Sequence, residues 1–97
     1  MIRSITVSGF KARMDKEDVQ ILDVREADEF AIRNIRGAIN LPLSGFPEIM
    51  NRLDKNLKYY VIDASGDRSH KACHFLTDAG YYAIKIKGGM EAWPENI

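Results

Sequence analysis

The sequence predicts a three-layer α/β fold, in which a mainly parallel sheet is covered by helices on both faces. Two observations lead to this prediction. Short apolar or β-branched runs alternate with segments of helical periodicity along all 97 residues. Some strand candidates are almost continuously apolar, as "YYVI" at 59–62 is, which is typical of strands buried on both faces. Length and pattern together predict a single domain over residues 1–97.

The first half of the chain is expected to contain three strands and two helices. The expected strands are residues 4–8, 19–24 and 38–41. Ser8 is placed to cap a short helix over 9–14, because its hydroxyl can accept a hydrogen bond from the first turn. A second helix follows in "READEF", 25–30, where early acidic residues suit the helix dipole. Gly37 then breaks the helical pattern.

The second half continues the alternation of helices and strands. Residues 46–53 are expected to form an amphipathic helix, because apolar side chains recur there at i, i+3, i+4 and i+7. The strand at 59–62 follows, and then a helix from 69 to 79 with one apolar face. Gly80 supplies a stop for this helix, and residues 83–86 form the last expected strand.

Composition and charge exclude several function classes. The 14 basic and 14 acidic residues give a formal net charge of zero, which argues against a general nucleic-acid or anionic-membrane binder. No apolar stretch approaches the ~20 residues of a spanning helix, and the N-terminus has no apolar core of a secretory signal. The sequence therefore predicts a cytoplasmic protein with no membrane partner.

The cysteine and histidine content predicts neither a disulfide nor a metal centre. Cys73 is the only cysteine, and its place on the apolar face of the 69–79 helix predicts a core role rather than a reactive one. His70 and His74 are four residues apart, but two histidines on one helix are typical of a solvated face. No metal and no cofactor is expected.

The stretch "DASGDRS", 63–69, has the features of an anion-binding loop. It follows a buried strand and leads into a helix, and ligands of open parallel sheets sit beyond such strand ends. Small residues let successive N–H groups point inward, the first helical turn adds further amides, and Arg68 offers a charged donor fork. The residues of this candidate cradle are Ala64, Ser65, Gly66, Asp67, Arg68 and Ser69. The alternative is an ordinary strand-to-helix turn with Ser69 as the helix cap.

Four motifs in order make the chain resemble a single rhodanese-homology domain over nearly its full length. They are "ILDVREADEF", "IRGAINLPL", "ASGDRSHKACHFLTDAGY" and "KGGMEAW". The resemblance implies a rhodanese-like fold with a five-stranded parallel sheet and helices on both sides. It also implies the family's chemistry, in which a cysteine at the first position of the loop takes up sulfur as a persulfide and passes it to a nucleophile.

By this resemblance, the position of the family's nucleophile is occupied by Asp63. A carboxylate cannot form a persulfide, so the chain resembles a sulfurtransferase scaffold that lacks its nucleophilic cysteine. The four residues between Asp63 and Arg68 match the sulfurtransferase spacing, whereas phosphatases of similar fold use a longer loop. A second departure is Asn34, which stands in a segment where the family commonly has Gly-His.

Three interpretations of Asp63 remain open at this stage. In the first, its carboxylate accepts hydrogen bonds from the loop amides and from Arg68, which closes the cradle. In the second, the domain is a non-catalytic binding or regulatory module for a protein partner. In the third, the chain is a thiosulfate-type sulfurtransferase whose natural cysteine at 63 was substituted, with Arg68 holding a small sulfur-containing anion.

Charged residues near the expected site have structural and functional interpretations. Asp23 and Arg25 flank a strand end, and a structural ion pair or cap is favoured over catalysis. Asp67 adds a second negative charge near the cradle, which would weaken affinity for free anions. A basic rim is possible if four arginines converge, and scattered solvated side chains are the alternative: Arg25, Arg33, Arg36 and Arg68. Trp93 is expected to be a packing anchor.

Overall fold

The structure, a computed structural model, describes residues 1–94. Within this part of the chain, five strands form one parallel sheet in the order β1-β5-β4-β2-β3. The strands are β1 (Arg3–Thr6), β2 (Gln20–Asp23), β3 (Ile39–Asn40), β4 (Lys58–Ile62) and β5 (Tyr82–Lys87). The predicted fold class is confirmed. Because β4 is the central strand, its carboxyl end lies in the middle of the sheet edge where a ligand site is expected.

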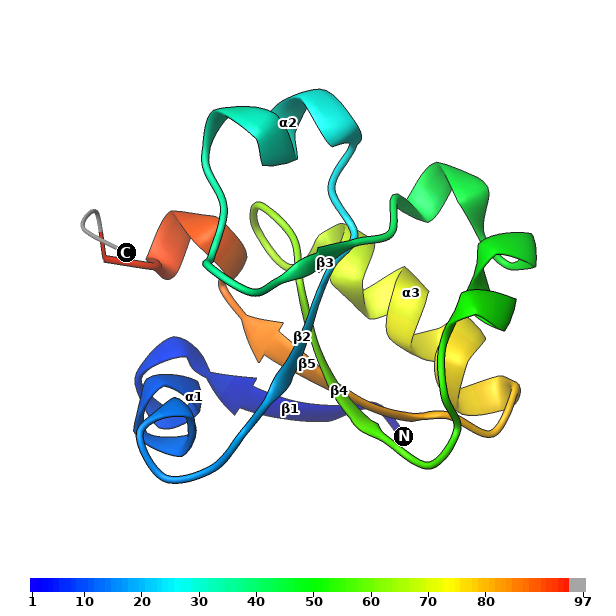
Figure 1. The fold of residues 1–97 in the computed structure, drawn as a ribbon, viewed down its shortest axis with the longest axis horizontal. Coiled ribbons are helices and arrows are strands. Elements are labelled where there is room, and N and C mark those ends of the chain that lie inside the picture. Colours follow the sequence, from blue (N-terminus) through cyan, green and yellow to red (C-terminus); the bar gives the residue numbers. More distant parts are fainter. Residues whose placement is uncertain (95–97) are drawn as a thin grey trace.

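Helices cover both faces of the sheet, with α1 on one side and α3 on the other (Figure 1). The α-helices are α1 (Val7–Met14), α2 (Ala27–Ile32) and α3 (Asp67–Asp78). Three 3₁₀ segments accompany them: η1 (Leu43–Gly45), η2 (Glu48–Arg52) and η3 (Gly89–Ala92). The remaining α-helix, α2, packs on neither face and lies beyond the carboxyl ends of the strands (Figure 1).

The side chains of β4 alternate between two hydrophobic clusters, one on each face of the sheet. Tyr59 and Val61 belong to the cluster under α3, which also contains Cys73. Tyr60 and Ile62 belong to the cluster under α1, where Phe10 packs on Tyr60 with ring centroids 4.8 Å apart. Both faces of β4 are therefore buried, as its continuous apolar sequence predicted.

The first helix begins earlier than the sequence predicted. It starts at Val7, directly after β1, and its N-cap is Thr6 rather than Ser8. The Thr6 hydroxyl accepts a hydrogen bond from the Gly9 N–H at 3.0 Å. Threonine and serine can both cap a helix, so neighbouring candidates could not be separated without knowing where the strand ends.

Residues 46–53 form the 3₁₀ segment η2 and its flanks instead of the predicted α-helix. Pro47 has no N–H to donate and restricts the preceding residue, and Phe46 is accordingly extended, with φ −80° and ψ 149°. The apolar pattern nevertheless serves the core. Phe46 and Met50 are buried, and Ile49 and Leu53 pack against the cluster under α3. The pattern was therefore a correct indicator of burial and a wrong indicator of helix type.

The helix after β4 begins at Asp67, two residues before the predicted start, and its N-cap is Gly66. Ser69 is therefore not the helix cap. Its hydroxyl donates to the Gly66 carbonyl at 3.1 Å within the first turn. Gly66 has a φ of +118°, a conformation that favours glycine and lets the chain turn sharply from the strand into the helix. At the other end, Gly80 follows the helix with a φ of +90°.

No helix in residues 1–94 has the length and apolar character needed to cross a membrane.

Cys73 should be unreactive in the native protein. It is fully buried in the cluster under α3, and burial raises the pKa of its thiol to about 12. We expect a thiol-labelling reagent at mildly alkaline pH to react with the folded chain on the order of a thousandfold more slowly than with the urea-unfolded chain, from thiolate fractions alone. Equal labelling rates in the two states would contradict the core assignment.

Candidate functional site

The candidate site lies where β4 and β2 end side by side. Asp23 at the end of β2 is paired with Ile62 at the end of β4, and the Val24 N–H donates to the Ile62 carbonyl at 3.0 Å. The loop 63–66 follows and turns into α3. Figure 1 shows this loop, α2 and η3 on the same side of the molecule. The backbone of the site is therefore assembled from three segments that are distant in sequence.

The Asp63 carboxylate is the acceptor at the centre of the loop. Its side chain is completely buried. Oδ1 accepts a hydrogen bond from the Gly66 N–H at 2.6 Å, and Oδ2 accepts one from the Ser69 N–H at 2.9 Å. These are a loop amide and a first-turn amide of α3, the donor types that make a cradle for an anion. Here they hold a carboxylate supplied by the loop itself.

Arg68 forms no hydrogen bond with Asp63, so the expected hydrogen bond between them is wrong. Its guanidinium forms a two-pronged pair with Glu29 of α2, with Nη1 donating to Oε1 at 2.6 Å and Nη2 donating to Oε2 at 2.9 Å. These hydrogen bonds lower the pKa of Glu29 from its usual 4.5 to about 2 and raise the pKa of Arg68 above its ordinary value. The cation that was expected to face the loop is neutralised by an acid from across the site.

Glu29 is the site residue that sequence reasoning missed. The sequence indicates it only as one of the acidic residues that suit the start of a helix. It also accepts a hydrogen bond from the Glu26 N–H at 3.1 Å, as part of a capping box at the start of α2. One signal was available, because α2 follows β2 and its first turn therefore lies at the same sheet edge as the loop after β4.

The neighbouring pair of Asp23 and Arg25 has a structural role. Both side chains are buried, and the Arg25 Nη2 donates to the Asp23 Oδ2 at 2.8 Å. The same nitrogen donates to the Arg33 carbonyl at 2.6 Å. The Asn40 amide adds hydrogen bonds to the carbonyls of Asp23 and Arg25, at 3.1 and 2.8 Å. This network engages the Nε and Nη2 of Arg25 and fixes the connection between β2 and α2.

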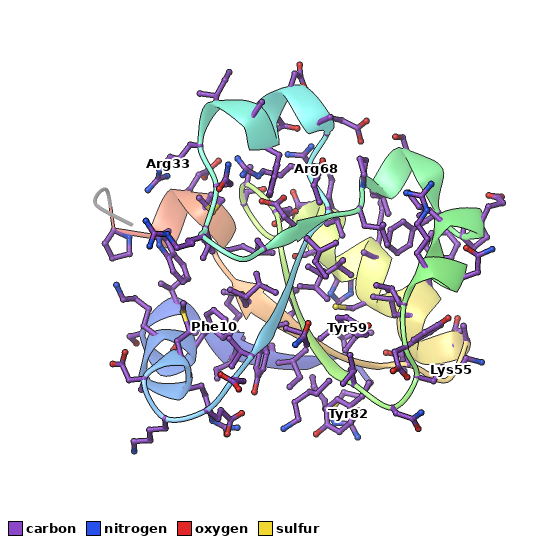
Figure 2. The ribbon with its side chains drawn as sticks, viewed as in Figure 1. Phe10, Arg33, Lys55, Tyr59, Arg68 and Tyr82 are labelled. Atoms are coloured by element: carbon purple, nitrogen blue, oxygen red, sulfur yellow. The ribbon has the colours of Figure 1, made fainter. Side chains whose placement is uncertain are left out.

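The remaining arginines do not form the basic rim that the sequence left open. Arg33 reaches toward the C-terminal segment, where its guanidinium donates to the carbonyls of Met90, Trp93 and Pro94 at 3.3, 3.3 and 2.9 Å (Figure 2). Arg36 is exposed. With Arg25 and Arg68 paired to carboxylates and Arg33 turned to main-chain carbonyls, these guanidinium groups do not form a shared rim of free charge.

The other predicted site residues are divided between the interior and the surface. Gly66 and Ser69 are buried, and Ala64 is partly buried, whereas Ser65 and Asp67 are exposed. Asn34 is exposed and donates to the Phe30 carbonyl at 2.8 Å, which places its amide on α2 rather than in the loop. In residues 1–94 no group of three or more His, Cys, Asp or Glu side chains is arranged to hold a metal ion.

The segment η3 fixes the loop from outside. The Met90 N–H donates to the Asp63 carbonyl at 2.7 Å, and the Glu91 N–H donates to the Ala64 carbonyl at 2.9 Å. A Cβ atom at Gly89 would overlap the Asp63 carbonyl oxygen and lie 2.6 Å from the Ala64 oxygen. The glycines of "KGGMEAW" therefore permit a backbone-to-backbone contact that defines the loop. Trp93 anchors the segment by packing on Phe10, with centroids 5.9 Å apart.

Comparison with known proteins identifies the family. A family model described as the rhodanese-like domain matches residues 6–96. The chain belongs to the rhodanese-like domain family. It is 34% identical over 93 residues to the putative sulfurtransferase YtwF of Bacillus subtilis, a match that covers 95% of this chain and 90% of that protein. It is 33% identical over 95 residues to a sulfurtransferase of Allochromatium vinosum, covering 96% and 89%.

Solved structures agree with this family assignment. The crystal structure of a rhodanese-like domain protein from Staphylococcus aureus is similar to this chain with a TM-score of 0.92 and 35% identity, covering 98% of this chain and 94% of that one. The resemblance found in the sequence motifs is confirmed. In this rhodanese-like domain the Asp-Val-Arg motif supplies a buried ion pair, and the C-terminal Gly-Gly motif supplies the contact with the loop.

Replacing Gly89 should disrupt the loop. We expect Gly89→Ala to lower the free energy of unfolding by about 3 kcal/mol or more, because the new methyl group adds an overlap with backbone atoms to a strained positive φ. Gly37→Ala is the matched control. Gly37 also has a positive φ, +86°, but a Cβ there meets nothing within 4 Å, so a loss of roughly 1–2 kcal/mol is expected. Equal losses in urea melts would show that η3 does not press on the loop.

The Glu29–Arg68 pair should make the free energy of unfolding depend on pH in the acidic range. Because the pKa of Glu29 is lowered on folding from 4.5 to about 2, its contribution is fully present above about pH 4.5 and is lost as pH falls toward 2. Both side chains are about one-third exposed, so Glu29→Gln is expected to cost up to about 1 kcal/mol at neutral pH.

Urea unfolding of the wild-type chain and of Glu29→Gln across this pH range measures the effect. The difference between the two should be largest at neutral pH and should disappear near pH 2, roughly the folded pKa. Glu17→Gln, which removes an exposed carboxylate, serves as the control and should show no such trend. If the difference in unfolding free energy between the wild-type chain and Glu29→Gln stayed unchanged near pH 2, the ion pair could not be its cause.

Proposed function

We propose that this rhodanese-like domain, with aspartate at position 63, carries no sulfur and acts as a binding or regulatory module. One observation supports this proposal above the others. The Asp63 carboxylate, at the position that the resemblance gives to the nucleophile, receives hydrogen bonds from two amides of the cradle, those of Gly66 and Ser69, at 2.6 and 2.9 Å. Two of the donors that would stabilise a persulfide or a bound anion are therefore already used.

Persulfide formation needs a thiolate, because the step forms an S–S bond and breaks a bond between the transferred sulfur and its donor. A carboxylate oxygen offers no equivalent stable carrier. Cys73 does not replace the missing thiolate, since it is buried on the core side of α3 with a pKa raised to about 12. The chain therefore lacks a residue for two-step sulfur transfer in residues 1–94.

The charges around the loop also favour recognition of a protein over capture of a small anion. A sulfur-containing anion would need free amides and an uncompensated cation. The amides of Gly66 and Ser69 are occupied by Asp63, and the Arg68 guanidinium is occupied by Glu29. A loop whose carboxylate is held by its own amides, and whose carbonyls are held by η3, presents a fixed surface, which suits a partner that docks on it.

The second candidate function is thiosulfate-type sulfur transfer by a chain whose natural cysteine at 63 was substituted. The loop frame supports it, because the two amides that hold the carboxylate would equally face a thiolate at that position. The relative from Bacillus subtilis is named a putative sulfurtransferase and aligns over 95% of this chain. Under this proposal Arg68 helps to hold the substrate anion once Glu29 releases it.

Substituting cysteine at position 63 tests whether this residue alone prevents sulfur transfer. We expect the unsubstituted chain to transfer no sulfur from thiosulfate to cyanide. Asp63→Cys should show measurable transfer, because the cradle amides would then stabilise a thiolate and its persulfide. Mass spectrometry after exposure to thiosulfate should detect one added sulfur atom only in this variant. Asp63→Ser, which also removes the carboxylate, is the control for the loss of charge and should be inactive.

The three possible results have distinct meanings. Activity in Asp63→Cys alone supports the proposal that Asp63 silences an otherwise intact cradle. Inactivity of a folded Asp63→Cys protein supports a binding module whose loop is no longer suited to sulfur. Activity in the chain as written would overturn the proposal that it carries no sulfur.

A further inference from the structure

A polar pocket opens at the amino-terminal end of the sheet, opposite the loop after β4. Its volume is about 290 Å³, and its lining includes Arg3, Arg13, Lys58, Tyr60 and Tyr82. Figure 2 shows Tyr82 at the end of the molecule away from Arg68. The pocket therefore shares no residue with the rhodanese-like site.

Strand alternation brings the pocket residues to one face of the sheet. Tyr60 and Ile84 are paired across β4 and β5, and both belong to the cluster under α1. Lys58 and Tyr82, two residues earlier in each strand, are also paired and extend the same face toward the amino-terminal edge. Arg3 of β1 is in register with Ile84 and completes the row. This part of the sheet face is where the pocket lies.

The side chains at the pocket are held by contacts with aromatic groups. Arg13, in the last turn of α1, donates from Nη1 to the Tyr60 hydroxyl at 3.4 Å. The Arg3 guanidinium carbon lies 4.6 Å from the centroid of the Tyr82 ring, and the Lys58 Nζ lies 5.3 Å from it. Three cations thus converge on one pocket from two strands and a helix.

Among the described residues, no acid forms a salt bridge with these three cations. The pocket lining contains no aspartate or glutamate. The salt bridges found among residues 1–94 are those of Arg25 with Asp23 and of Arg68 with Glu29, and neither involves a pocket cation. Like charges held close together repel one another unless an anion lies between them. In a chain of zero formal net charge, such a concentration of positive charge points to an anionic ligand.

We infer that this pocket binds the diphosphate or phosphate group of a small molecule. Arginine guanidinium groups match phosphate oxygens with paired N–H donors, and a lysine adds a third positive charge. The volume is near the lower end for small-molecule sites, which suits a compact charged group. The Tyr82 ring is already in contact with the cationic groups of Arg3 and Lys58. The part of the ligand that the pocket recognises is therefore its oxyanion rather than an aromatic ring.

Titration with pyrophosphate, followed by amide NMR at constant ionic strength, tests the inference. Saturable shifts are expected at Arg3, Arg13, Lys58 and Tyr82, with weaker binding of inorganic phosphate and weaker binding still of succinate. Succinate is a dianion without the tetrahedral oxygen arrangement, so equal affinity for it would reduce the site to general charge attraction and overturn the inference. Non-saturable shifts would overturn it too.

Charge-removing variants locate the binding. Arg3→Gln and Arg13→Gln should each weaken pyrophosphate binding at least about tenfold, because each removes a charged donor fork. Arg52→Gln removes the same charge from an exposed position in η2 and should leave the affinity unchanged. Equal weakening in all three variants would assign the effect to net charge and contradict a built pocket. The NMR spectrum of each variant reports whether it is folded.

Two further measurements distinguish a small-molecule pocket from a nucleic-acid surface and from the site around Asp63. A short single-stranded RNA that bound more tightly than pyrophosphate would assign the cations to a nucleic acid and overturn the small-molecule inference. Asp63→Cys should bind pyrophosphate as the parent chain does, because residue 63 lies at the other end of β4. A loss of binding in that variant would contradict the separation of the two sites.

Discussion

The amides at the start of a helix need acceptors, and this constraint shapes the loop between β4 and α3. Asp63 supplies one carboxylate oxygen to the Ser69 N–H in the first turn of α3 and the other to the Gly66 N–H. A buried carboxylate is tolerated only with such donors, so each side compensates the other. The direction of α3, and with it the position of Arg68 and the Glu29 contact that holds α2, follows from this turn.

The two ends of the sheet differ in how their charges are compensated. At the carboxyl end, Asp23 is paired with Arg25, and Glu29 is paired with Arg68. The short helix α2 has no buried residue, so its placement depends on these polar contacts rather than on apolar packing. At the amino-terminal end the cations have aromatic neighbours and no carboxylate partners within residues 1–94. The apolar clusters between the two ends separate them physically.

Sequence reasoning succeeded where the information is local. The strand at 59–62 and the apolar face of α3 are written in continuous or periodic runs, and the structure contains both. Boundaries were less certain, because adjacent residues such as Thr6 and Ser8 have the same capping chemistry. The contact between Glu29 and Arg68 joins residues 39 positions apart, and no local pattern encodes which of several acids reaches that arginine. The role of Pro47 in replacing an α-helix by a 3₁₀ segment was visible in the sequence but was outweighed by periodicity.

The hydrogen bonds from η3 have a consequence for how this fold can change. They bind the main-chain carbonyls of Asp63 and Ala64 and make no use of either side chain. The path of the loop is therefore fixed from outside, while the Gly66 and Ser69 N–H groups donate inward to the side chain at position 63. The backbone path of the loop is therefore independent of the side chain at position 63. Domains of this kind can diverge between catalysis and recognition by one substitution at that position, with the loop backbone unchanged.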